Sequence, residues 1–292
     1  MTGVKSIISI TSVIGYIERH LSEQLDLDIV AKAVHYSKYH LHRLFSDTVG
    51  MTIHDYIQRR RLTQAAKLLV FSGKSIMSIS LLAGYQSQQA FTSVFKAMYK
   101  LTPLEFRENE VFYPLQLEYK LDVSKSMPPR NFTVEDIRFA RMCDIPSWME
   151  LVRLAVDGFP CLDEAEHITA LKTAIAKRRA LMLSERDIAV GAMMISYDTG
   201  SIDFLAVHPL YRKQGLSRLF LGKAIEELIS EKQISITTYR EGDRADLGYR
   251  KALKELGFTE AELLTEFGYP TQKFVFPAAE QHAANAGTPP LT

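Results

Sequence analysis

Two stretches of the sequence carry side chains that suit a negatively charged ligand. The first is a turn between an expected strand and an expected helix, formed by Arg212, Lys213, Gln214, Gly215, Leu216 and Ser217. Backbone N–H groups at the start of a helix bind anions, and a glycine lets the anion come close, so this turn suits a pyrophosphate. The alternative for so short a pattern is an ordinary connection between a strand and a helix.

The second stretch consists of two similar segments that would present polar side chains between inward-facing apolar ones. The apolar residues that must pack inward are Leu41, Leu44 and Phe45 in one segment and Phe91, Val94 and Phe95 in the other. The outward-facing side chains are Lys38, Tyr39, His42 and Arg43, followed by Gln88, Gln89, Thr92, Ser93 and Lys96. Arginine pairs with guanine, glutamine with adenine and lysine with phosphate, so these faces predict DNA contacts; a solvated helix face is the alternative.

These segments belong to a duplicated helix-turn-helix unit. At a spacing of 49, the matched pairs are Leu27 with Ile76, Val30 with Ile79 and Tyr36 with Tyr85. At a spacing of 50, they are Ser37 with Ser87, Leu41 with Phe91, Phe45 with Phe95 and Thr52 with Thr102, so the second turn is one residue longer. A first helix over 9–24 precedes the repeat, and the expected N-caps of the following helices are Asp26, Ser37, Thr52, Ser75, Ser87 and Thr102. Between the two units, 52–71 predicts one helix of roughly 30 Å. Such a helix could hold two recognition helices in successive major grooves, about 34 Å apart.

Charge and composition agree with this division. Residues 1–107 carry 13 Lys/Arg and 7 Asp/Glu, a balance of +6, whereas the remainder carries 22 and 27, a balance of −5. A basic part joined to an acidic part suits an N-terminal partner that is an anion, although the bias is modest. The two cysteines suggest no disulfide framework and so a reducing cytoplasm, and no apolar run suits a membrane span or signal peptide. His40 and His42 have no further ligand at metal-binding spacing, and no metal is expected.

The first hundred residues resemble a known family. They are similar to the AraC/XylS DNA-binding domain, in the branch that includes MarA, SoxS and Rob. The residues that carry the resemblance are Tyr56-Ile57, Arg61-Leu62, Ala65, Gly84-Tyr85, Phe91, Thr102-Pro103 and Phe106-Arg107. The resemblance implies that Tyr39, His42 and Arg43 face one major groove. It implies that Gln88, Gln89 and Ser93 face the next one. His42 and Ser93 replace residues usual in that branch, so the operator sequence does not follow from the resemblance.

Farther along, hydropathy predicts a connector and an α/β domain. Alternation through 112–123 predicts a half-buried strand that could add an edge strand to the second domain or to a partner, followed by a linker at Pro128-Pro129. Strands are expected at 132–139, 180–183, 189–196, 202–207, 234–238 and 271–276, and helices at 145–156, 163–177, 216–231 and 244–256. The predicted order is β-α-α-β-β-β-α-β-α-β, with a mostly antiparallel first half.

The basic turn lies in a longer pattern that resembles a second family. The pattern looks like the acetyl-CoA signature of GNAT acyltransferases at Val207-His208-Pro209, Tyr211-Arg212, Gly215 and Ser217-Arg218. Farther on, Gly257-Phe258 looks like part of their closing segment. The resemblance implies that the strand around Leu205 to Val207 offers free backbone groups to pantetheine. It also implies that N–H groups from Gln214 to Ser217 hold the pyrophosphate. Ser217 replaces the usual glycine or alanine. Leu253 stands where these enzymes often have a tyrosine that protonates the leaving thiolate.

Candidate catalytic residues follow from the need to remove a proton from an amine. A carboxylate acting through water is a plausible base, which makes Asp203 and Glu241 candidates, and Tyr249 could replace the missing tyrosine if its helix were shifted. The alternative for each carboxylate is a solvated surface position. Cys161 is not expected to form a covalent intermediate, because GNAT transfer is normally direct.

Together these patterns predict two domains. The first is an all-α double helix-turn-helix domain of AraC type over 8–108, and the second an α/β GNAT acyl-CoA N-acyltransferase fold with a mixed, splayed sheet over 132–277. A connector over 109–131 joins them, and 278–292 is expected to be a disordered tail.

The predicted function is a sequence-specific DNA-binding transcriptional regulator whose GNAT domain binds acetyl-CoA and acetylates, or senses, a small amine. Its expected partners are double-stranded promoter DNA, acetyl-CoA and the amine, with RNA polymerase a further candidate and no membrane. Two alternatives remain open. One is chiefly an N-acetyltransferase with an autoregulatory DNA-binding domain; the other is a catalytically inactive GNAT fold that senses a ligand.

Overall fold

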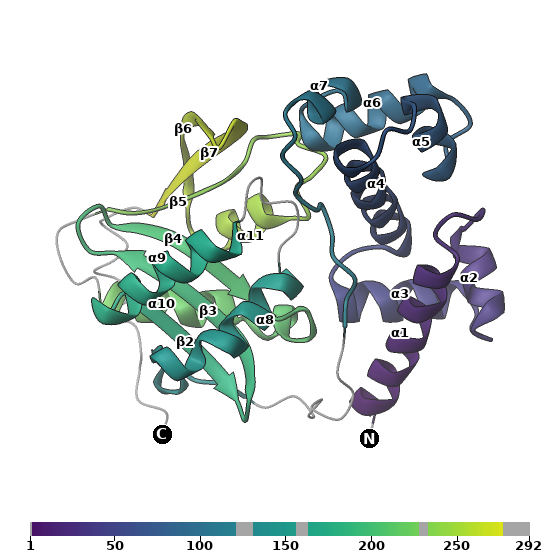
Figure 1. Cartoon of the computed structure of the whole chain (residues 1–292). Helices are drawn as coiled ribbons and strands as arrows, with labels where there is room; N and C mark the ends of the chain where they lie inside the picture. The colour runs from purple at the N-terminus through teal and green to yellow at the C-terminus, as the bar shows by residue number, and fades with distance from the viewer. Residues whose placement is uncertain (1, 121–130, 156–162, 228–232, 277–292) are drawn as a thin grey trace. The chain divides into compact units, whose positions relative to one another are not determined.

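The computed structural model describes residues 2–120, 131–155, 163–227 and 233–276, and it divides the chain into two compact units (Figure 1). The N-terminal unit consists chiefly of residues up to Arg130 together with the short segment Asp243–Leu247. The C-terminal unit contains Asn131–Ala155, Asp163–Gly242 and the residues from Gly248 onward. No helix among the described residues is long and apolar enough to cross a membrane. The predicted tail lies outside the described residues.

The N-terminal unit is helical throughout its regular structure. Its helices are α1 (Thr2–Arg19), α2 (Leu27–Ala33), α3 (Lys38–Val49), α4 (Ile53–Phe71), α5 (Ile76–Leu82), α6 (Gln88–Tyr99) and α7 (Pro103–Glu108). All six predicted N-caps accept a backbone N–H at the start of their helix, and Thr102 forms the full capping box with Glu105. The first helix differs from its prediction, because the chain turns after Arg19, where His20 donates to the carbonyl of Ile17.

The turns of the two repeated units confirm the one-residue difference. In the first, the backbone N–H of Tyr36 donates to Ala31 at 2.9 Å, and His35 between them has a left-handed φ of 57°. In the second, Tyr85 donates to Ser80 at 3.0 Å, and Gly84 has a φ of 80°. In both units a left-handed residue therefore stands at the equivalent position after the first helix, and the extra residue of the second unit is Gln86, between Tyr85 and the N-cap Ser87.

Helix α4 is buried on several sides, which explains its three consecutive arginines. Arg60 forms a double hydrogen bond with Glu18 of α1 at 2.7 Å and donates to the carbonyl of Gln116 at 2.9 Å. Arg61 donates to the carbonyls of Leu21 and Glu23, and Arg59 is 1% exposed. The three arginines therefore pack within the N-terminal unit, where Arg60 joins α4 to α1 and Arg61 binds the chain that follows α1.

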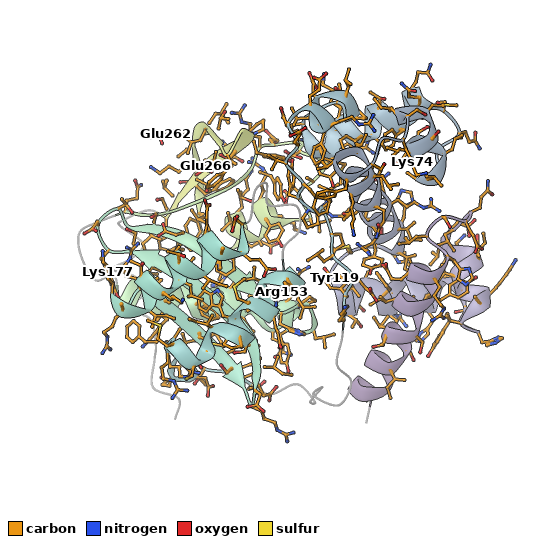
Figure 2. The ribbon with its side chains drawn as sticks, in the orientation of Figure 1. Lys74, Tyr119, Arg153, Lys177, Glu262 and Glu266 are labelled. Carbon is orange, nitrogen blue, oxygen red and sulfur yellow. The ribbon has the colours of Figure 1, made fainter. Side chains whose placement is uncertain are left out.

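The predicted strand in the connector is wrong for the residues that are described. Residues 110–120 form no strand, and the rest of the prediction, 121–123, lies outside the described part. Instead, Thr63 of α4 accepts the backbone N–H groups of both Leu115 and Gln116 at 3.1 Å. Leu115 and Tyr119 (Figure 2) are buried, and the Tyr119 ring stacks on Tyr56. The alternation reflects an extended chain packed on a helical surface.

The C-terminal unit is built around a mixed sheet. Its strands are β1 (Arg138–Phe139), β2 (Ala180–Glu185), β3 (Ile188–Ser196), β4 (Ser201–Val207), β5 (Ile234–Tyr239), β6 (Thr259–Glu266) and β7 (Tyr269–Phe276). They lie in the order β1-β2-β3-β4-β5-β7-β6. Neighbours pair antiparallel except β4 and β5, which are parallel and share only the register Ser201↔Ser235 in the described chain. The antiparallel first half is confirmed, and the two parallel strands separate beyond that point.

Two predicted elements of this unit differ from the structure, and one strand is additional to the prediction. The strand expected over 132–139 is a short 3-10 turn, Val134–Asp136, followed by the two-residue β1. Strand β6 was not predicted, because its side chains are mostly exposed and it exists by pairing with β7. Helix α11 (Tyr249–Glu255) begins later than expected, because Asp243–Leu247 belongs to the N-terminal unit, where Arg59 donates twice to the carbonyl of Ala245 at 3.2 Å.

Helices cover both faces of the sheet. Helices α8 (Ile145–Ala155) and α9 (Glu164–Ala176) pack on one face, where Trp148 stacks against Phe204 of β4 and donates to the ring nitrogen of His167. Arg153 (Figure 2) fastens α8 to α9 through Glu164. Helix α10 (Leu216–Glu227) covers the other face, with Phe220 so close to Gly191 of β3 that a Cβ there would lie within 2.4 Å of the ring.

Candidate functional site

The predicted recognition residues of the first unit lie on α3. Ser37 caps this helix, and Leu41 and Phe45 are fully buried, so the opposite face turns outward. Lys38, His42 and Arg43 are exposed, and the Tyr39 side chain is 87% exposed. Lys38 pairs with Asp28 of α2 at 2.8 Å, and this hydrogen bond raises the pKa of Lys38.

The predicted recognition residues of the second unit lie on α6 in the same way. Phe91 and Phe95 are fully buried and hold the helix against α4 and α7. Gln88, Gln89, Ser93 and Lys96 are exposed, whereas Thr92 is half-buried. The structure thus presents each predicted set on one helix, on the side opposite the core.

The basic turn of the C-terminal unit forms a 3-10 helix, Pro209–Gln214, that leads into α10. Between them Gly215 has a left-handed φ of 71°, and a Cβ at this position would meet nothing within 4 Å. The N–H groups of Leu216 and Ser217 belong to the first turn of α10, where a helix leaves its donors without backbone partners of its own. The turn therefore offers donors and open space on one side.

Two other residues of the pattern are structural. His208 is buried and accepts the backbone N–H of Leu210, and burial, with the charge of Arg212 as a smaller cause, lowers its pKa to about 4. The imidazole is therefore neutral near pH 7. The Tyr211 hydroxyl donates to buried Glu185 at 2.7 Å, and burial raises the pKa of Tyr211. The Tyr211 side chain anchors the turn to β2, whereas the His208 side chain caps the start of the turn itself.

Strand β4 carries the other predicted ligand residues. Leu205 and Val207 are half-buried and pair with β3 on one side. On the side toward β5, the described pairing stops at Ser201, so the remaining edge of β4 leads toward the Gly215 turn. An edge of this kind has backbone groups available for an extended ligand.

The three catalytic candidates lie in different places. Asp203 is partly exposed on β4, where one carboxylate oxygen accepts from Ser201 at 2.5 Å and the other from Arg179 at 3.1 Å. Glu241 is exposed in the turn after β5, and Tyr249 is the first residue of α11, with its ring 6.3 Å from that of Tyr239. Sequence reasoning missed Arg179 and Ser201, because nothing in their spacing indicates that they surround Asp203.

Leu253 occupies the position at which the resemblance implies a tyrosine. Its side chain is 6% exposed and packs in the main core with Phe258 and Phe274. Tyr249 lies one helical turn earlier, at the exposed start of the helix. Position 253 itself has no group that could donate a proton.

Comparison with known proteins bears on the first third of the chain. A family model described as a helix-turn-helix domain matches residues 30–109. The probable transcription factor PqrA of Proteus vulgaris is 39% identical over 102 residues, which are 34% of this chain and 84% of PqrA. The regulatory protein SoxS of Escherichia coli (strain K12) is 39% identical over 98 residues, which are 34% of this chain and 92% of SoxS.

These relatives and the two outward-facing helices define a class of protein, the sequence-specific DNA-binding transcriptional regulators. Within that class, the chain belongs to the AraC/XylS family.

Solved structures show slighter likenesses. An AraC-type transcriptional regulator from Chromobacterium violaceum is 31% identical and covers 35% of this chain and 91% of that chain, with a TM-score of 0.34. A GNAT-family acetyltransferase from Bacillus cereus ATCC 10987 is 16% identical and covers 48% of this chain and 94% of that chain, with a TM-score of 0.39. Neither TM-score supports a conclusion, so the role of the C-terminal unit must follow from its own topology and residues.

Proposed function

We propose that the chain is a regulator in which α3 and α6 contact successive major grooves of promoter DNA, while the C-terminal unit has a GNAT fold and binds acetyl-CoA. A single observation carries the second part of the proposal. The Gly215 turn, with its open space and first-turn donors of α10, follows the end of β4, whose described pairing with β5 stops at Ser201.

The residues of this region fit two parts of acetyl-CoA, the charged pyrophosphate and the polar pantetheine arm. The first-turn N–H groups after Gly215 would hold the pyrophosphate, and Arg212 adds positive charge beside them. The β4 edge from Leu205 to Val207 would pair with the pantetheine arm. When bound, acetyl-CoA supplies an activated acetyl group for transfer to an amine. Asp203 would bind that amine, and water near it would accept the proton.

On DNA, the proposal assigns a role to each recognition helix. Arg43 and the glutamines at 88 and 89 would pair with base edges, whereas Lys38 and Lys96 would contact phosphates. Helix α4 has 19 residues and spans about 28 Å. It separates the two helix-turn-helix units by roughly the rise of one DNA turn. A random-duplex selection that enriches no sequence at physiological salt would overturn this assignment.

The cofactor proposal is tested by calorimetric titration of the full chain with acetyl-CoA. We expect micromolar affinity for the natural sequence and a large loss for Gly215→Glu, because the new carboxylate would occupy the open space and repel the pyrophosphate. Gly268→Glu is the matched control, since Gly268 also has a left-handed φ and open surroundings but lies in the β6–β7 turn. Equal affinity in both variants would place the cofactor elsewhere.

A second candidate function is ligand sensing without acetyl transfer. It is favoured by Leu253, which has no proton to donate, and by Asp203, whose two oxygens are already engaged by Arg179 and Ser201. Release of free CoA in the presence of an amine panel separates the two candidates. Turnover supports the enzyme, whereas a shift in DNA affinity without CoA release supports the sensor, with a coupling of about 1–3 kcal/mol.

A further inference from the structure

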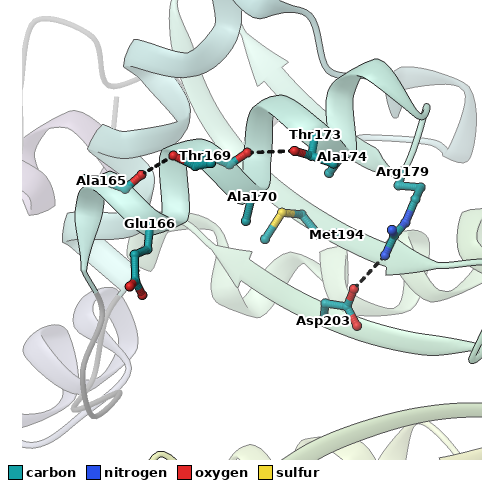
Figure 3. Close-up of a pocket in the computed structure, with 9 residues that line it drawn as sticks. All are labelled: Ala165, Glu166, Thr169, Ala170, Thr173, Ala174, Arg179, Met194 and Asp203. Atoms are coloured by element: carbon teal, nitrogen blue, oxygen red, sulfur yellow. Dashed lines mark hydrogen bonds and ion pairs between the residues drawn. The ribbon is translucent and has the colours of Figure 1, made fainter.

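A groove of about 630 Å³ lies between α9 and strands β3 and β4 (Figure 3). Helix α9 forms its longer wall, Met194 of β3 forms part of its floor, and Asp203 and Arg179 close one end. Glu166 lies at the other end. The volume is within the range of roughly 300–1,000 Å³ typical of small-molecule sites.

The α9 wall is more apolar than its sequence suggests. The hydroxyl of Thr169 donates to the carbonyl of Ala165 at 2.8 Å, and that of Thr173 donates to Thr169 at 3.1 Å. Because these hydroxyls are turned onto the helix backbone, the threonines present chiefly their methyl groups. With the alanines at 165, 170 and 174, they make a wall of methyl groups.

A β-bulge places Asp203 in this groove. Met194 pairs with Phe204 and Ile195 with Ile202, so Asp203 has no partner on β3. Ile202 faces the α10 side, in the core with Phe220, whereas Phe204 faces α9 through His167. The extra residue turns Asp203 to the same side as Phe204, because a bulge interrupts strict alternation. Asp203 is also two residues beyond Ser201, where β4 parts from β5.

The charges of the lining select the kind of ligand. Glu166 and Asp203 are negative and Arg179 is positive, which leaves one net negative charge among the lining residues. Within the described chain, the Glu166 carboxylate has no hydrogen-bond or ion-pair partner. A carboxylate oxygen accepts more than one hydrogen bond, so Asp203 can still accept from a ligand. The complement of this lining is a single positive charge on an apolar body.

We propose that this groove binds a small monovalent organic ammonium ion, with its nitrogen toward Asp203 and its hydrocarbon body along the methyl wall of α9. The inference rests on the proposed function, because it names the class of acceptor or effector for the same site. Glu166 and Thr173 are seven residues apart on α9, about 10 Å along the axis, so a one-ring amine fits the wall. A polyamine would bring more positive charges than the one net negative charge of the lining can balance.

The test is a ligand-observed NMR titration of the full chain, without acetyl-CoA, using benzylamine, benzyl alcohol and spermidine as probes. Benzylamine is expected to bind about tenfold more tightly than the other two, a difference of about 1.4 kcal/mol. Equal binding of benzyl alcohol would show that charge plays no part, and tighter binding of spermidine would show that the groove prefers polycations. Either result would overturn the proposal.

Variants localise the binding. Ala170→Trp fills the groove and should abolish benzylamine binding, whereas Lys172→Trp, on an exposed position of α9 outside the groove, should not. Glu166→Gln should weaken binding roughly two- to fivefold, and Glu164→Gln, whose carboxylate pairs with Arg153, should leave it unchanged. Circular dichroism checks that every variant is folded. Retained affinity in Ala170→Trp would refute the site.

The same samples are then titrated with acetyl-CoA, which separates the two proposals. If acetyl-CoA binds and benzylamine does not, the inference about the groove fails and the proposed cofactor function stands. If benzylamine binds and acetyl-CoA does not, the groove is a ligand site and the cofactor proposal fails.

Discussion

The two helix-turn-helix units share a framework but present different surfaces. Helix α3 presents two cations and the 87% exposed ring of Tyr39, whereas α6 presents amide and hydroxyl groups with the single cation Lys96. Their frameworks match in N-cap, left-handed turn residue and inward aromatic position. Duplication has kept what each unit needs to fold and changed what it offers to a partner.

The cores beneath these surfaces also differ. In the second unit Phe95 contacts the rings of Phe91, Tyr99 and Phe106, and the cluster continues to Tyr113 of the connector. In the first, the ring contact of Phe45 is with Tyr56. The second unit therefore depends more on aromatic packing. The first is fastened to its neighbours by the buried pair of Arg60 and Glu18, whose side chains are 7% and 13% exposed.

The largest expected effect tests the difference between the cores. Phe45→Ala and Phe95→Ala should each cost about 3–5 kcal/mol of stability, because both rings are fully buried. The cost at Phe95 should be larger by about 1 kcal/mol, since more ring pairs are lost. Both costs are measured by unfolding the full chain with urea and monitoring the loss of DNA binding. Equal costs would remove the distinction between the two cores.

The next effect tests the proposed division of DNA contacts. Arg43→Ala and Gln89→Ala should each weaken binding to a selected duplex by about 1–3 kcal/mol, by losing a base contact. Lys96→Ala should weaken binding to all duplexes alike and reduce the slope of affinity against salt by about 0.9. Fluorescence anisotropy at several salt concentrations gives both quantities. An unchanged affinity for Arg43→Ala would contradict its assignment.

Substitutions in the turns of the two helix-turn-helix units should have smaller effects on stability. Gly84→Ala should cost about 1–2 kcal/mol, because φ there is left-handed and the new Cβ would lie 3.1 Å from the guanidinium of Arg61. His35→Gly should change stability by less than about 1 kcal/mol, since relief of a left-handed conformation offsets the added freedom of the unfolded chain. Thermal unfolding compares them, and a harmless Gly84→Ala would show that the second turn accepts a Cβ at this position as the first turn does at His35.

The smallest effect concerns Asp28, the acidic residue that pairs with Lys38 of the first recognition surface. Asp28 pairs with exposed Lys38, so Asp28→Asn should free the lysine for phosphate and strengthen DNA binding at low salt by roughly two- to fivefold. The gain should disappear as salt screens the charge. Asp47→Asn, elsewhere on α3, is the matched control. Weaker binding of the Asp28 variant would show that the pair orders Lys38 for DNA.

Local signals predicted the N-terminal unit closely. Capping residues act within three positions of the helix start, and the repeat fixed both turns, so six helix starts and the longer second turn followed from short patterns. The connector was misjudged because an alternating pattern is the same for a strand and for an extended chain on helices. Which of these forms depends on the partner of the backbone N–H groups, here Thr63.

Across both units, local features followed from the sequence and long-range ones did not. The sequence alone determined the caps, the repeat, the recognition faces and the Gly215 turn, because each depends on neighbours within a few residues. Only the tertiary structure decided that Asp203 faces α9 and is engaged by Arg179, 24 residues away in the chain. A bulge changes the face of a side chain through the register between strands, and register is settled by the packing of the whole sheet.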